Sequence, residues 1–186
     1  IISCSQTEES KIKIGAILPL TGPYAIAGTD AKNAIDLALE DLNNIKVIYE
    51  DSQGENTKAV ASFNKLVNID NAKIILTSTS WISNTLYQQA IDTDIIQAII
   101  ASAGFQRSKD KDKAIRFTVQ VKEEAQYLKE FLKKFNRIAI FSLNNDFGKL
   151  WADELKKEFK EKIVVVETRA PTDIDMKTQL TKIKAQ

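Results

Sequence analysis

Signals for β-strands and α-helices alternate along almost the whole chain, and this alternation limits the fold more than any other feature of the sequence. Short apolar runs predict strands at residues 11–18, 45–50, 73–76, 95–101, 115–121, 137–143 and 163–168. Apolar residues spaced three or four apart predict helices between them, at residues 31–42, 56–67, 83–91, 123–135, 147–159 and 175–184. Such alternation is typical of an α/β fold, in which right-handed crossovers build a parallel sheet.

The series of strands and helices starts afresh near residues 119–123. We therefore expect two lobes, each a doubly wound parallel sheet, at residues 11–120 and 121–186, with a polar tether at residues 1–10. The last predicted helix has no strand after it in this sequence, so we expect the second lobe to be incomplete.

The residue content argues against several kinds of site. The sequence has no histidine, so the commonest acid–base residue and the commonest metal ligand are absent. Its single cysteine can form neither an intrachain disulfide nor a structural zinc site. Basic residues number 26 and acidic residues 25, so the basic excess of a nucleic-acid-binding protein is missing. Neither glycine-rich phosphate motif is present, nor a G-x-S-x-G elbow. We expect no cofactor, no metal, no nucleic acid and no enzymatic activity.

The single cysteine, Cys4, lies in the opening sequence IISCSQ, ahead of a polar stretch. Two apolar residues, a small residue and a cysteine resemble the lipobox at the end of a bacterial lipoprotein signal peptide. That resemblance implies lipidation of Cys4 and a membrane anchor. A free thiol near the chain terminus is the alternative.

Loops rich in hydroxyl groups and small residues follow two of the predicted strands. One is TSTS at residues 77–80, and the other is SAG at residues 102–104. Ligands of open parallel sheets bind beyond the carboxyl ends of the strands, and a helix start favours an anion. A carboxylate would suit these loops, although helix caps and turns use the same residue types.

Four segments carry a resemblance to a known family. They are IKIGAILPLTGPYAIAGTDAKNAIDLALEDLN, VIYEDSQGENTKAVASFNKLV, RIAIFSLNNDFGKLWADELKKEF and TDIDMKTQLTKIKA. In this order and spacing they resemble the amino-acid-type substrate-binding proteins of ABC transporters, the leucine/isoleucine/valine-binding group with the type I periplasmic-binding-protein fold. The resemblance implies a periplasmic or extracytoplasmic protein that binds an amino acid between its lobes and delivers it to a membrane permease.

The same resemblance implies roles for particular residues. Ser80 matches the serine that meets the ligand carboxylate, and Phe147 matches an aromatic residue offered by the second lobe. Ser102, Ala103 and Gly104 match the loop that meets the ligand's head group.

Two further aromatic residues are candidates for the site. Trp81 stands where the family usually has a small residue, and it either narrows the pocket or packs in the core. Tyr24, after the Thr-Gly-Pro turn, is a second possible cleft aromatic.

Two other functions remain open at this point. One is a ligand-sensing receptor domain of the same fold. The other is an interaction lipoprotein that activates cell-wall synthesis and has no affinity for small ligands.

Overall fold

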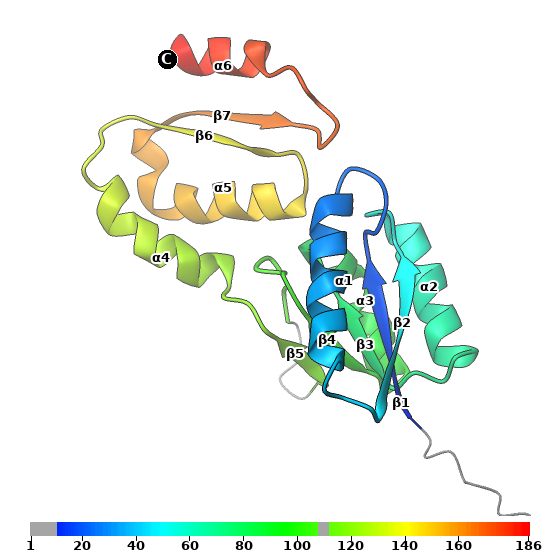
Figure 1. Cartoon of the computed structure of the whole chain (residues 1–186). Helices are drawn as coiled ribbons and strands as arrows, with labels where there is room; N and C mark the ends of the chain where they lie inside the picture. The colour runs from blue at the N-terminus through cyan, green and yellow to red at the C-terminus, as the bar shows by residue number, and fades with distance from the viewer. Residues whose placement is uncertain (1–10, 108–111) are drawn as a thin grey trace, which may run out of the picture.

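The fold is that of two separate parallel sheets joined through residues 117–120, as a computed structural model of residues 11–107 and 112–186 shows (Figure 1). The sheet of the first lobe has the strand order β2-β1-β3-β4-β5, and its neighbouring strands are all parallel. These strands are β1 (Ile12–Leu18), β2 (Ile45–Asp51), β3 (Ile74–Thr77), β4 (Ile96–Ile99) and β5 (Ala114–Arg116).

Three helices enclose this first sheet. Helix α1 (Ala25–Leu39) covers one face, and α2 (Asn56–Asn68) and α3 (Ser80–Asp92) cover the other (Figure 1). The main core lies under α2 and α3, where fully buried side chains of both helices meet the sheet; it includes Phe63, Leu66, Ile75, Ile82 and Leu86. A parallel sheet covered on both faces explains why its strands read as near-continuous apolar runs.

The second lobe is built on a two-stranded parallel sheet. Its elements are α4 (Val121–Leu132), β6 (Ile138–Leu143), α5 (Asp146–Phe159), the 3-10 turn η1 (Lys160–Lys162), β7 (Ile163–Arg169) and α6 (Lys177–Lys184). Strands β6 and β7 pair in parallel, with α4 and α5 on one side and α6 on the other (Figure 1). The α/β class and the partial second lobe are thus confirmed.

Several predicted element boundaries are wrong. Helix α1 spans Ala25–Leu39 rather than residues 31–42, so residues predicted as loop form its first turns. Strand β5 ends at Arg116 rather than at residue 121; residues 117–120 connect it to α4, whose first residue is Val121. The Glu123 carboxylate accepts a hydrogen bond from the Gln120 backbone N–H, and this fixes the start of that helix. Helix α3 begins at Ser80 rather than at residue 83, so residues predicted as loop form its first turn.

Each lobe has a glycine where the helix after its first strand passes close to the loop before that helix. A Cβ built on Gly28 would lie 2.0 Å from the Pro19 carbonyl oxygen, and one built on Gly148 would lie 2.1 Å from the Leu143 carbonyl oxygen. No side chain fits at such distances, so glycine is required by the close approach of two backbones.

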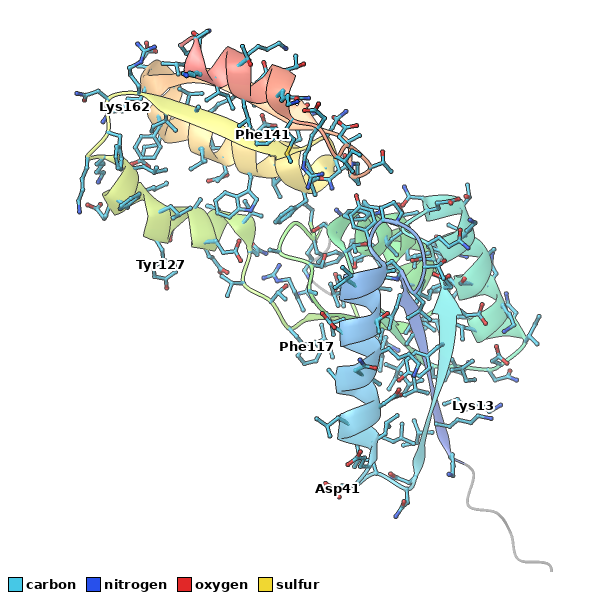
Figure 2. The ribbon with its side chains drawn as sticks, turned by 45° about the horizontal axis from the view of Figure 1, so that its top comes forward. Lys13, Asp41, Phe117, Tyr127, Phe141 and Lys162 are labelled. Atoms are coloured by element: carbon cyan, nitrogen blue, oxygen red, sulfur yellow. The ribbon has the colours of Figure 1, made fainter. Side chains whose placement is uncertain are left out.

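Several large apolar side chains are exposed on the surface, including one in the interlobe segment and one on α4. Phe117 in the interlobe segment is 67% exposed, and Tyr127 on α4 is 84% exposed; Figure 2 shows both directed away from the lobes. Within the described residues, none of the helices has the length and apolar content needed to cross a membrane.

Candidate functional site

The loop after β1 is fixed by a carboxylate at the end of the neighbouring strand β2. Oδ1 of Asp51 accepts hydrogen bonds from the backbone N–H groups of Leu20, Thr21 and Gln53, at 2.8, 3.2 and 2.8 Å. Its Oδ2 accepts another from the Thr21 hydroxyl at 2.5 Å. Gly22 completes the turn in the left-handed region, with φ 83°. Strand β1 can therefore end at this loop, because Asp51 accepts hydrogen bonds from backbone N–H groups that no longer pair with a neighbouring strand.

The pKa of Asp51 is lowered from its ordinary value. Burial raises the pKa of this carboxyl group, but the hydrogen bonds from Thr21, Gln53 and Leu20 together outweigh burial. The folded protein therefore favours the ionised form, and Asp51 stabilises the fold above the pKa of the unfolded chain, about 3.9. This stabilisation is lost as the pH falls through the lower pKa of the folded state.

We expect Asp51→Asn to lower the free energy of unfolding by about 2 kcal/mol at pH 7, because an amide cannot accept all these hydrogen bonds. Urea denaturation of both proteins at pH 7, 5 and 3 measures the difference, which should shrink toward zero at the acid end. Asp41→Asn is the control, since Asp41 is an exposed acid just after α1 (Figure 2). An equal loss at pH 3 and pH 7 would contradict the ionised role of Asp51.

The two candidate aromatic residues Tyr24 and Trp81 contact each other. Their ring centroids are 4.8 Å apart with the planes tilted by 51°. The indole N–H of Trp81 donates to the Gly54 carbonyl oxygen at 3.0 Å, and a Cβ on Gly54 would lie 2.8 Å from the Tyr24 ring. Trp81 also packs against the main core. These contacts join the loops that follow β1, β2 and β3.

A buried polar network fixes the loop between β3 and α3. The hydroxyl groups of Thr77 and Ser83 lie 3.0 Å apart. The Gln97 amide on β4 donates to the Ser83 carbonyl oxygen at 2.9 Å. Thr79, directly before α3, has φ 66°, a strained value for a residue with a branched side chain. The network therefore fixes the unusual backbone that places Ser80 at the start of α3.

Ser80, Gly104 and Phe147 come together from three different elements. The Gly104 backbone N–H donates to Oγ of Ser80 at 3.0 Å, and Ser80 is only 4% exposed. A Cβ built on Gly104 would lie 2.8 Å from Ser80 Oγ and 3.3 Å from Cδ2 of Phe147. The loop after β4 therefore lies between the start of α3 in the first lobe and the start of α5 in the second.

Several buried polar atoms around these loops have no hydrogen-bond partner among the described residues. In the first lobe they are the hydroxyl groups of Ser78, Thr79 and Ser102. In the second lobe they are the hydroxyl group of Ser142 and Nδ2 of Asn145, beside the start of α5. A buried polar atom without a partner is costly, and most such atoms are satisfied by a ligand or by water.

The remaining predicted residues lie in the same region, with one exception. The Ala103 carbonyl oxygen accepts from the Val121 backbone N–H at 3.0 Å, so the loop after β4 also contacts the start of α4. Phe105, in the same loop, is buried against Tyr87 in an edge-to-face contact. Cys4 lies outside the described residues.

Sequence reasoning missed the residues that support the site from behind. Asp51 lies 30 residues after its partner Thr21, and Gln97 lies 14 residues after Ser83. The one signal in the sequence was the position of each polar residue at or inside a buried strand. Among the described residues there is also no group of three or more acidic, cysteine or histidine side chains that could hold a metal ion.

Two parallel-sheet lobes whose polar loops meet at the carboxyl ends of their strands define a class of two-lobed α/β proteins. Comparison with known families is more specific. The family model described as periplasmic binding protein matches residues 11–186, and the chain belongs to this family.

Individual relatives agree with this assignment. The chain is 26% identical to the Leu/Ile/Val-binding protein BraC3 of Rhizobium johnstonii over 190 residues, which cover 94% of this chain and 52% of that protein. It thus spans about half the length of this curated relative. Among solved structures, it matches an extracellular ligand binding receptor from Desulfohalobium retbaense with 29% identity and a TM-score of 0.89, covering 94% of this chain and 33% of that one.

A further solved structure shares the fold. It is the branched-chain amino acid transporter substrate binding protein LivJ from Streptococcus pneumoniae, in complex with isoleucine. The identity is 22% and the TM-score 0.80, with 95% of this chain and 55% of that chain covered. The family model is described as periplasmic binding protein, and the curated relative is a binding protein by name.

Proposed function

We propose that this chain is part of an extracytoplasmic solute-binding protein of an ABC importer, and that it binds an amino acid or a similar small polar ligand between its two lobes. One observation carries the proposal. Ser80 and Gly104 of the first lobe meet Phe147 of the second lobe, so hydrogen-bonding groups and an aromatic ring come together where the two lobes touch.

The contacts of Ser80 suit an anionic group on the ligand. Its oxygen already accepts a hydrogen bond from the Gly104 N–H, so its own hydrogen is left to donate outward. The backbone N–H groups at the start of α3 add partial positive charge. The unpartnered hydroxyl groups of Ser78, Thr79 and Ser102 provide further donors nearby. A carboxylate is the group that this arrangement would stabilise best.

Phe147 gives the second lobe an apolar contact with the ligand. Its ring approaches the Gly104 position directly, so a ligand held by Ser80 would lie close to this ring. Tyr24 and Trp81 would then form the neighbouring wall. The names of two related proteins support an amino acid as the ligand: one is a Leu/Ile/Val-binding protein, and the other was solved with isoleucine.

The partners follow from this function. The loaded protein would deliver its ligand to an ABC permease in the membrane. Lipidation of Cys4 would keep the protein at the membrane surface, with residues 5–10 as a tether. Mass spectrometry of the protein isolated from its membrane fraction tests the anchor directly.

A thermal-shift screen of the full-length protein against the twenty standard amino acids and small carboxylates tests the proposal. A ligand at about 100 times its dissociation constant stabilises the folded state by about 2.7 kcal/mol. A clear shift with one chemical class supports solute binding. No shift with any compound, in protein stripped of bound ligand, would instead favour the interaction lipoprotein. A shift in a gene product with a signalling segment would favour the receptor.

We expect Ser80→Ala to weaken binding of the best amino acid from this screen by roughly tenfold to one hundredfold, because it removes a donor to a charged group. Isothermal titration calorimetry measures the change. Thr85→Ala on an exposed face of the same helix is the matched control and should bind as the wild type does. An unchanged dissociation constant for Ser80→Ala would exclude the carboxylate role.

A further inference from the structure

Asn84, one helical turn beyond Ser80 on α3, makes a pair of hydrogen bonds to the loop after β4. Its Nδ2 donates to the Gly104 carbonyl oxygen at 3.3 Å, and its Oδ1 accepts from the Gln106 backbone N–H at 2.9 Å. The orientation of the amide follows from these partners, since rotating it by 180° would set a donor against a donor and an acceptor against an acceptor.

This pair of bonds acts on the same loop residue that meets Ser80. The N–H of Gly104 donates to Ser80, and its carbonyl oxygen accepts from Asn84, so both polar groups of this residue are bonded to α3. The loop also contains Ala101 with φ 47°, a conformation that a residue with a side chain rarely adopts. Such a backbone persists only where its surroundings hold it in place.

We propose that Asn84 is a positioning residue for ligand binding, which acts through Gly104 and does not touch the ligand. This inference rests on the proposed function. Asn84 fixes the distance between Gly104 and α3, and two contacts of Gly104 depend on this distance. One is the hydrogen bond that directs the Ser80 hydroxyl, and the other is the approach of Gly104 to Phe147.

The position of Asn84 explains why an amide serves here. Only a side chain with both a donor and an acceptor can bond a carbonyl oxygen and an N–H group two residues apart on the same loop. Aspartate could accept from Gln106 but could not donate to Gly104, and alanine could do neither. Asn84→Asp therefore removes only the hydrogen bond to Gly104, whereas Asn84→Ala removes the bonds to both Gly104 and Gln106.

The experiment compares wild type with Asn84→Ala and Asn84→Asp in the full-length protein. Residue-resolved amide hydrogen exchange is measured without ligand, and the dissociation constant is measured with L-leucine as the probe. The matched control is Gln88→Ala, since Gln88 is an amide one turn further along α3 that bonds only Asp92 within the described residues. Circular dichroism melts show whether each variant remains folded.

We expect the Gln106 amide to exchange at least about tenfold faster in Asn84→Ala and to stay protected in Asn84→Asp. The dissociation constant for L-leucine should rise about tenfold in Asn84→Ala. Gln88→Ala should change neither quantity.

Three other results are decisive. Unchanged exchange at Gln106 in Asn84→Ala would overturn the contact itself. Faster exchange with an unchanged dissociation constant would overturn the positioning role and leave only a structural one. If the wild type binds neither L-leucine nor any other amino acid, the proposed function fails. The positioning role of Asn84 in ligand binding then fails with it, and the exchange data test only the contact between Asn84 and the loop.

Discussion

Replacing Gly28 by alanine is expected to lower the free energy of unfolding by at least about 3 kcal/mol. The new Cβ would lie 2.0 Å from the carbonyl oxygen of Pro19 and 2.5 Å from its carbonyl carbon. Both are backbone atoms, so a side-chain rotation cannot relieve the contact. Either α1 or the loop before it must move, and the hydrogen bonds of Asp51 hold that loop in place.

The expected sign of the change in stability is opposite to that of an ordinary glycine-to-alanine substitution in a helix. Glycine to alanine inside an ordinary exposed helix stabilises a protein by about 1 kcal/mol, because alanine is the better helix former. Chemical denaturation of Gly28→Ala should show the opposite sign. Thr29→Ala, on the exposed surface one residue further along α1, is the matched control and should lie within about 0.5 kcal/mol of the wild type. Stabilisation by Gly28→Ala would show that α1 does not pass this close to Pro19.

The architecture could be predicted from sequence because the alternation of apolar runs and helical stripes is a local signal. It repeats along the chain, and one periodic pattern is enough to identify each element. The boundaries that failed depend on contacts made elsewhere. Helix α3 starts early because Gln97 and Ser83, on different elements, support its first turn.

The site could be predicted in part. Ser80, Gly104 and Phe147 were named from the resemblance to a family, and the structure places all three together, although whether they bind a ligand stays a prediction. The roles of Asp51 and Asn84 could not be predicted. Each bonds the backbone of a loop that is distant in sequence, and nothing in the local pattern reveals which loop that is.

Gly104→Leu is expected to weaken ligand binding by more than about one hundredfold, equal to about 2.7 kcal/mol. A Cβ at this position lies 2.8 Å from Ser80 Oγ and 3.3 Å from Phe147, so any side chain enters the space between the two lobes. Leucine adds three more carbon atoms there. It would displace the Ser80 hydroxyl and keep Phe147 from approaching, and both contacts are part of the proposed site.

Folding should suffer less than binding in this variant. The backbone of Gly104 does not lie in the left-handed region, so a side chain causes no strain of its own. The contact with Ser80 should reduce the free energy of unfolding by about 1–3 kcal/mol, as overpacking usually does. Calorimetric titration with the best ligand of the screen, beside a melt of each protein, separates the two effects.

Gly104→Ala provides a graded comparison and should fall between wild type and Gly104→Leu in affinity. If instead Gly104→Leu binds the ligand within threefold of the wild type, the ligand does not lie between Ser80 and Phe147. The site would then have to be sought at other loops of the two sheets. A loss of affinity that follows side-chain size, in proteins that remain folded, would place the ligand at the contact between the lobes.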